Sequence, residues 1–266
     1  MIQGLAQINV ELSSKCSKSC GFCGRRQWDK AHGTADYGNM DFELVRILAE
    51  EIPRGTTVAT HWNGESMMHP FFGECIRLFK DRGCFVYTVT NGKHLAEKAA
   101  QIDGILDVVS VSIIENDKER ERSEQYENII KFLNLRVTEK PRIVLRYVGF
   151  VDDLRFDELG LPIVRRTLHR PEGSIGYRQE PPIPENHVCR EMLYSLAVDW
   201  KGNVSPCVRF DPYGEMILGN LHDSSLETLW NSPKRLYYRQ MHIDGNRSKL
   251  KYCGDKCSYW GVPASD

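Results

Sequence analysis

The chain has 266 residues, 41% of them hydrophobic and 27% charged, which is enough to bury the core of one large domain or of a large and a small one. Its 35 basic and 36 acidic residues nearly cancel, so charge gives no sign of a nucleic-acid partner or of a membrane surface. The N-terminus lacks a signal-peptide pattern and no apolar run reaches membrane-spanning length. We therefore expect a cytoplasmic protein whose nine cysteines are metal ligands or reduced thiols.

Strands and helices are predicted to alternate over the first two thirds of the chain. The strands are expected at 8–12, 57–62, 85–90, 108–113, 143–148 and 174–178, and the helices at 41–48, 71–79, 93–101, 126–133 and 155–166. This order implies an α/β fold with a parallel sheet, either open and doubly wound or closed into a partial barrel. Ser110 and Ser112 share one face of the fourth strand, which favours a curved sheet with a polar inner face.

Three prolines at 181, 182 and 184 break regular structure and suggest a domain boundary. We place a first domain at 1–180 and a second, smaller one at 181–266. The second domain is expected to contain a β-hairpin over 196–207, with a turn at Gly202, followed by helices at 225–230 and 233–241.

Three cysteines follow the first strand at the spacing C-x3-C-x2-C: Cys16, Cys20 and Cys23. Thiolates on one short loop bind soft metals or iron–sulfur clusters, and three of them leave one iron of a [4Fe-4S] cluster without a protein ligand. A zinc site would usually show paired C-x2-C units, and a disulfide cluster would suit a secreted protein. Both alternatives fit this loop less well than an iron–sulfur cluster does.

This loop, with the aromatic Phe22 before its third cysteine, resembles the cluster loop of the radical S-adenosylmethionine (AdoMet) enzymes. The resemblance implies a partial (β/α)6 TIM-like barrel with its chemistry at the carboxyl ends of the strands. It also implies that the open iron binds the amino and carboxylate groups of AdoMet. One-electron reduction then cleaves AdoMet to a 5′-deoxyadenosyl radical.

The resemblance implies an AdoMet-binding segment after the second strand, at Asn63-Gly64-Glu65-Ser66. This segment resembles the Gly-Gly-Glu-Pro motif of the family but keeps only the central Gly64 and Glu65. The glycine would allow close approach of the backbone, and the glutamate would offer an anionic acceptor to the AdoMet amino group.

Later strands supply further positions that the resemblance assigns to AdoMet. Asn91 lies in a Thr-Asn-Gly sequence that is frequent in the family, and Ser112 matches a serine that contacts the carboxylate or the ribose. Arg122 resembles the arginine that pairs with the carboxylate, although Arg120 is close enough to compete and a solvated helix face is the alternative for both.

A second group of cysteines comprises Cys189, Cys207, Cys253 and Cys257. Four thiolates can hold a zinc ion or ligate every iron of a cubane cluster. The sequence around Cys207 resembles the C-terminal SPASM/twitch extension of radical AdoMet enzymes, and four cysteines indicate the shorter twitch form with one auxiliary [4Fe-4S] cluster. The layout of the whole chain is similar to that of aminocyclitol dehydrogenases in this superfamily.

The resemblance implies a radical AdoMet oxidoreductase that abstracts hydrogen from an unactivated carbon of a small polar substrate. Dehydrogenation would follow, with the auxiliary cluster as electron acceptor and flavodoxin or ferredoxin as the reducing donor. Arg146, Arg178 and Arg209 are candidates for binding an anionic substrate, and Tyr177 is a candidate proton acceptor, with structural roles as the alternative.

Two rival functions remain at this point. The first is a peptide-modifying radical AdoMet enzyme; the first strand begins near residue 8, which leaves little room for a leader-binding domain and favours a small molecule. The second rival is a zinc-stabilised binding protein without redox chemistry.

Overall fold

The structure is a computed structural model that describes residues 2–20, 23, 25, 29, 33, 36–115, 117–166, 188–207, 214, 216–251 and 253. Nine strands of this part form one sheet in the order β6-β5-β4-β3-β2-β1-β7-β8-β9. The strands are β1 (Gln7–Val10), β2 (Thr57–Ala59), β3 (Phe85–Thr90), β4 (Val108–Ile114), β5 (Arg142–Val148), β6 (Ile163–Arg166), β7 (Ser195–Val198), β8 (Asn203–Ser205) and β9 (Gly219–Asn220).

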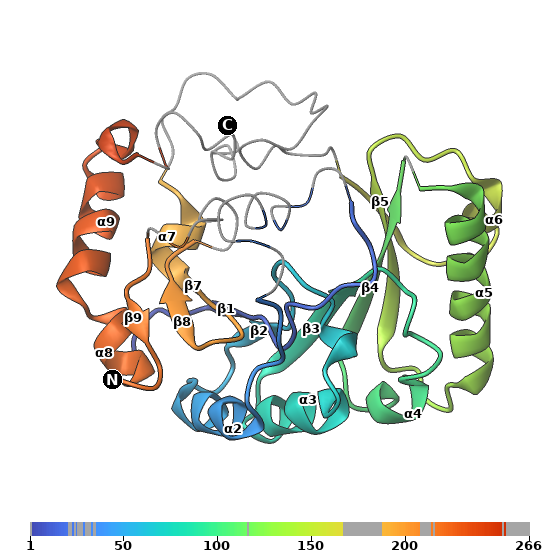
Figure 1. Cartoon of the computed structure of the whole chain (residues 1–266), viewed down its shortest axis with the longest axis horizontal. Helices are drawn as coiled ribbons and strands as arrows, with labels where there is room; N and C mark the ends of the chain where they lie inside the picture. Colours follow the sequence, from blue (N-terminus) through green and yellow to red (C-terminus); the bar gives the residue numbers. More distant parts are fainter. Residues whose placement is uncertain are drawn as a thin grey trace.

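The first six strands pair in parallel in sequence order, as βα units with helical crossovers require. The sheet curves, and α2 to α6 lie along its outer side (Figure 1). The described helices are α2 (Phe42–Glu51), α3 (Phe72–Asp81), α4 (Ala99–Ile102), α5 (Glu119–Leu135), α6 (Leu154–Asp157), α7 (Arg190–Tyr194), α8 (Leu226–Trp230) and α9 (Pro233–Ile243), with 3-10 turns η1 (Ser66–Met68) and η2 (Arg247–Lys249).

Alternating burial distinguishes the two faces of the sheet. Val109, Val111 and Ile113 of β4 are fully buried in the main core, whereas Ser110 and Ser112 between them are only half-buried. Because side chains alternate along a strand, the serines face the concave side. The predicted polar inner face is therefore confirmed.

Local sequence explains several element ends. Asp41 begins α2 and its carboxylate accepts the backbone N–H groups of Glu43 and Leu44, as its predicted N-cap role requires. Ser232 caps α9 in the same way, and Pro233 occupies its first turn, where a missing N–H costs nothing.

Two predicted elements differ from the structure. Residues 163–166, expected at the end of a helix, form β6 beside β5, because α6 ends at Asp157 and Gly160 adopts a φ of 63°. The helix expected at 93–101 is reduced to α4, preceded by turns. The strand predicted at 174–178 and the proposed boundary at residues 180 and 181 lie outside the described residues.

The C-terminal hairpin continues the sheet of the barrel. β7 and β8 form the predicted antiparallel hairpin, and β7 also pairs in parallel with β1 along its whole length. The two cysteine groups are thus attached to the same sheet, since one follows β1 and the other flanks the hairpin.

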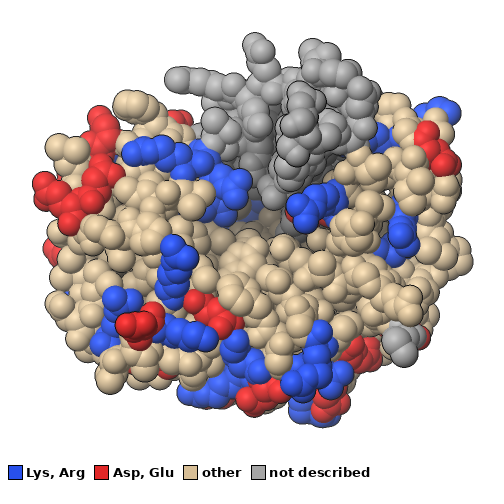
Figure 2. All heavy atoms as spheres, turned by 180° about the vertical axis from the view of Figure 1, so that it is seen from behind, with Lys and Arg blue, Asp and Glu red and all other residues tan. Residues whose placement is uncertain are grey.

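On the face seen in Figure 2, Lys and Arg side chains are interspersed with Asp and Glu over the described surface, in line with the near-zero net charge. Across the described residues, none of the helices has the length and apolar character needed to cross a membrane.

Helix α5 offers a matched test of the core. Phe132 is fully buried whereas Leu135 is 58% exposed, three residues further along the same helix. We expect Phe132→Ala to lower the free energy of unfolding by about 3–5 kcal/mol, because it leaves a cavity in the core. Leu135→Ala should change it by less than about 1 kcal/mol. Urea unfolding of both variants checks this, and equal losses would contradict the packing of α5.

Candidate functional site

The cluster loop follows β1 at the carboxyl edge of the sheet. Cys16, Cys20 and Cys23 are each half-buried, and the Cys23 amide donates to the Cys20 carbonyl at 3.1 Å. Burial raises the pKa of the Cys20 thiol to about 12, and the neighbouring Cys23 and Cys16 add to the rise. A bound cationic metal centre would favour the deprotonated form of Cys20 in such surroundings.

The AdoMet segment predicted after β2 packs directly on this loop. A Cβ atom at Gly64 would lie 2.0 Å from the Ser13 carbonyl oxygen and 2.5 Å from the Ser14 Cα atom. The Glu65 amide donates to the Lys15 carbonyl at 2.7 Å. Glycine at position 64 is therefore required by the close approach of two backbones.

The other residue of this segment that faces the loop is Asn63. Its carbonyl oxygen lies 3.8 Å from the Cys23 sulfur atom. The structure thus brings the predicted segment and the cluster cysteines together.

Glu65 holds the ends of two strands together. Its buried carboxylate accepts the Met67 amide at 3.3 Å and the Asn91 amide at 2.8 Å. Burial raises the pKa of this carboxyl, and the hydrogen bond from Asn91 opposes the rise. Glu65 was expected to face the AdoMet amino group, but each of its oxygens accepts a backbone N–H. It therefore positions Asn91, whose side-chain nitrogen lies 3.8 Å from the Cys16 sulfur atom.

Two residues that tie the site together were missed by sequence reasoning. Gln125 is buried, and its amide nitrogen donates to the Asn91 carbonyl at 2.6 Å and to the Ser112 carbonyl at 2.8 Å. Lys18, within the cluster loop, forms an ion pair with Asp117 at 2.8 Å. The sequence signal for Gln125 is that Ile129 and Phe132 follow it at the spacing of one helix face. Nothing local marks Lys18.

The structure separates the two competing arginines. Arg122, near the start of α5, is half-buried, and its side chain reaches the end of β4. There it donates to the Ile114 carbonyl at 3.4 Å and to the Glu115 carbonyl at 2.5 Å. Arg120 is 90% exposed and pairs with Glu124. Arg122 therefore turns towards the end of β4, whereas Arg120 faces solvent.

Arg146 is half-buried in β5 and is the register partner of Ser112, so both lie on the concave face of the sheet. This placement agrees with the predicted role in substrate binding. The other predicted residues, Phe22, Tyr177, Arg178 and Arg209, lie outside the described residues.

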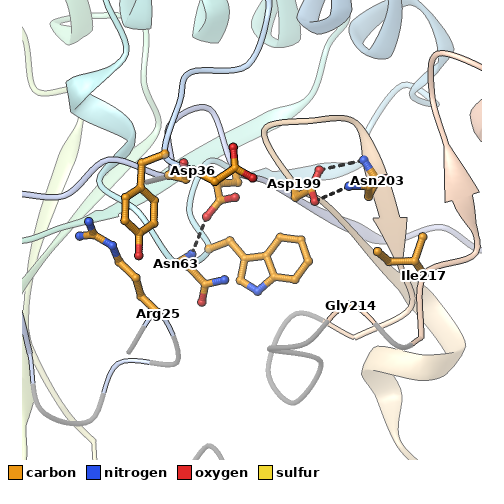
Figure 3. Close-up of a pocket in the computed structure, with 11 residues that line it drawn as sticks. Arg25, Asp36, Asn63, Asp199, Asn203, Gly214 and Ile217 are labelled. Atoms are coloured by element: carbon orange, nitrogen blue, oxygen red, sulfur yellow. Dashed lines mark hydrogen bonds between the residues drawn. The ribbon is translucent and has the colours of Figure 1, made fainter. Parts of the chain in front are cut away.

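A pocket lies between the carboxyl ends of β1 and β2 and the tip of the β7–β8 hairpin (Figure 3). Glu11 lines it, fully buried, and accepts the Asn63 amide at 3.0 Å and the Trp200 amide at 3.4 Å. Burial, with a smaller contribution from Asp199, raises the pKa of Glu11 to about 7. Glu11 therefore links the AdoMet segment to the C-terminal hairpin.

The second cysteine group converges in a small apolar cluster. Cys253 packs there with Met192, Met216 and Leu250, and Cys189 and Cys207 lie against it. Cys257 lies outside the described residues. The predicted cysteine ligands that can be placed therefore form two groups, three thiols in each.

The described part of the chain contains no group of three His, Cys, Asp or Glu side chains that could hold a single metal ion. A cubane cluster binds each thiolate at a different iron, so its thiols surround a larger volume than those of a single ion. The all-sulfur donor sets suit iron–sulfur clusters.

Comparisons with known proteins agree with this geometry. Residues 189–258 match the SPASM family, an iron–sulfur cluster-binding domain, and this range spans all four cysteines of the second group. The chain is 22% identical over 256 residues to the S-adenosyl-L-methionine-dependent 2-deoxy-scyllo-inosamine dehydrogenase of Niallia circulans, covering 93% of this chain and 91% of the relative.

A second relative is the tungsten-containing aldehyde ferredoxin oxidoreductase cofactor-modifying protein of Pyrococcus furiosus, 23% identical over 298 residues, with 87% of this chain and 82% of the relative covered. The crystal structure of BtrN in complex with AdoMet and 2-DOIA has a TM-score of 0.66 at 18% identity, covering 97% of this chain and 99% of that chain. The expected α/β partial-barrel fold and the C-terminal iron–sulfur domain are therefore confirmed.

The contact at Gly64 predicts a loss of AdoMet affinity. In Gly64→Ala the new methyl group must displace the backbone of the cluster loop, at a cost of about 1–3 kcal/mol. We expect AdoMet to bind roughly tenfold more weakly or worse, measured by equilibrium dialysis on the reconstituted protein. Ser19→Ala, at an exposed position of the same loop, is the control and should bind AdoMet normally. Equal affinities for the two variants would contradict the close approach.

Glu11 predicts a pH dependence of stability. Its pKa is about 7 in the folded protein against 4.5 for a free glutamate. The contribution of protonated Glu11 to the free energy of unfolding is therefore complete below pH 4.5 and is lost as the pH rises towards 7. Between pH 5 and pH 8 the free energy of unfolding should fall by about 2.5 kcal/mol more in the wild type than in Glu11→Gln. Identical pH profiles in urea unfolding would refute the assignment.

Proposed function

We propose that this chain, a radical AdoMet enzyme with a C-terminal SPASM-type iron–sulfur domain, abstracts hydrogen from an unactivated carbon of a small polar substrate and oxidises it. When bound, a [4Fe-4S] cluster on Cys16, Cys20 and Cys23 supplies the open iron for AdoMet and the electron that cleaves it to a 5′-deoxyadenosyl radical. The observation that carries the proposal is the packing of the Asn63–Glu65 backbone on the loop of these three cysteines.

The chain's own residues position and shield the reactants. The Asn63 carbonyl and the Asn91 side chain lie beside cluster sulfurs, where they can orient the amino end of AdoMet. Arg122, in the first turns of α5, reaches the end of β4, and our proposal gives it the AdoMet carboxylate as partner; Ser112 lies on β4 itself. Holding the reactants in one orientation supplies much of the rate enhancement in such reactions.

Oxidation of a small molecule is supported by the dehydrogenase relative, which this chain matches over nearly its full length. Arg146 on the concave face suits an anionic group of the substrate, and Arg178, Arg209 and Tyr177 remain predicted contributors. In a dehydrogenation the substrate loses one hydrogen atom to the radical, then a proton and an electron, which leaves a carbonyl. A cluster held by the second cysteine group would be able to accept that electron.

The first cluster needs a reductant, for which we propose flavodoxin or ferredoxin in the cytoplasm. The proposal contains two separate electron transfers. The first cysteine group serves the transfer that cleaves AdoMet, and the second serves the transfer that removes an electron from the substrate. Variants of the two groups should therefore fail in different ways.

We test this under anaerobic conditions with dithionite, AdoMet and deuterated candidate metabolites, following 5′-deoxyadenosine and oxidised product. Cys20→Ala should abolish the formation of 5′-deoxyadenosine and of oxidised product, because the variant cannot hold the cluster whose open iron binds AdoMet. Cys207→Ala should still release 5′-deoxyadenosine but should form at least about tenfold less product, because the electron has no acceptor. Exposed Ser17→Ala, in the same loop as Cys20, is the control.

Three outcomes would contradict the proposal. A preparation that holds only zinc would indicate a binding protein without redox chemistry. Intact AdoMet after incubation of the wild type with dithionite would exclude the radical reaction. Deuterium transfer from a peptide encoded beside the gene, and from no free metabolite, would indicate peptide modification instead.

A further inference from the structure

The apolar cluster around the second cysteine group contains a buried positive charge. Arg247, in the short turn η2, is only 3% exposed, and its guanidinium donates to the carbonyl oxygen of Cys253 at 3.2 Å. Leu250, which packs with Cys253, donates its amide to the Arg247 carbonyl at 2.9 Å. The turn thus fixes a cation beside the backbone of Cys253, a predicted cluster ligand.

The charge of Arg247 reaches two other buried side chains of this region. Burial raises the pKa of the Cys189 thiol; Glu191 adds to the rise and Arg247 opposes it. Burial, with Arg247 as the second cause, lowers the pKa of His242 to about 4, so this histidine is neutral. His242 is 3% exposed on α9, beside Met241, which packs against the cysteines. Arg247 is therefore close to residues of both η2 and α9 in this cluster.

A buried cation beside an iron–sulfur cluster lowers the energy of an electron that is added to the cluster. Adding one electron to a cluster adds one negative charge, and an adjacent positive charge stabilises it strongly where the surroundings are apolar. Charge, hydrogen bonding and burial are the means by which proteins set the reduction potentials of iron–sulfur clusters.

We infer that Arg247 raises the reduction potential of the auxiliary cluster, so that this cluster accepts the electron released by the substrate. The inference rests on the proposed function. The C–H bond of the substrate breaks as the C–H bond of 5′-deoxyadenosine forms, and the hydroxyl proton leaves to solvent. The remaining electron goes to the auxiliary cluster and a carbonyl is left. Arg247 does not touch the substrate; it positions a charge beside the acceptor.

The test measures the potential without any turnover. In a Cys16→Ala, Cys20→Ala, Cys23→Ala background only the auxiliary cluster should be present, and a redox titration followed by electron paramagnetic resonance gives its midpoint. We expect Arg247→Met and Arg247→Gln to lower the ratio of reduced to oxidised cluster at least tenfold at a fixed potential, a shift of about 59 mV for one electron. Arg247→Lys should stay close to the wild type because it keeps the charge.

The matched control is Lys249→Met, which removes a positive charge from the same turn at an exposed position. Solvent and salt screen this charge, so its loss should leave the midpoint nearly unchanged. Shifts for Arg247→Met and Arg247→Gln no larger than that of Lys249→Met would overturn the inference.

The iron and sulfide content of each variant distinguishes the remaining outcomes of this experiment. If the neutral variants fail to assemble a cluster that the wild-type background holds, the role of Arg247 is structural and the inference also fails. A background protein that binds zinc in place of iron and sulfide would overturn the proposed function as well. An unchanged midpoint in fully loaded variants would overturn only the role of Arg247.

Discussion

The contact on which the site depends is the approach of two backbones at the carboxyl edge of the sheet. The Glu65 amide lies 2.7 Å from the Lys15 carbonyl, and no side chain fits at Gly64 because Ser13 and Ser14 occupy its space. This contact fixes the cluster loop to the end of β2. The Glu65 carboxylate and then Gln125 extend the connection to the ends of β3 and β4. Buried hydrogen bonds of this kind hold a reactive loop in one geometry.

The C-terminal segment is joined to this frame through β1. Because β7 pairs with β1 from Gln7 to Val10, the hairpin that leads to Cys207 belongs to the same sheet as the first cluster loop. Glu11 strengthens the junction with one hydrogen bond to each side. The pairing of β1 with β7 therefore sets how the two cysteine groups lie relative to one another.

Much of this arrangement could be predicted from local sequence. The alternation of Ser110 and Ser112 with apolar residues predicted the polar face of β4, and the predicted segment at Gly64 does pack on the loop of Cys16, Cys20 and Cys23. Non-local features could not be predicted in the same way. β6 forms because pairing with β5 outweighs a helical pattern, and the parallel pairing of β7 with β1 joins residues almost 190 apart. The carboxylate of Glu65 faces backbone amides, which only the packed strand ends determine.

The central claim is that the first three cysteines hold an iron–sulfur cluster with one iron open to AdoMet. Electron paramagnetic resonance of the reduced Cys189→Ala, Cys207→Ala, Cys253→Ala protein tests it most directly, because only the first cluster should remain. The account predicts a [4Fe-4S] signal whose g-values change when AdoMet is added, as the cofactor binds the open iron. A signal that AdoMet leaves unchanged, or a protein that holds zinc at these cysteines, would contradict it.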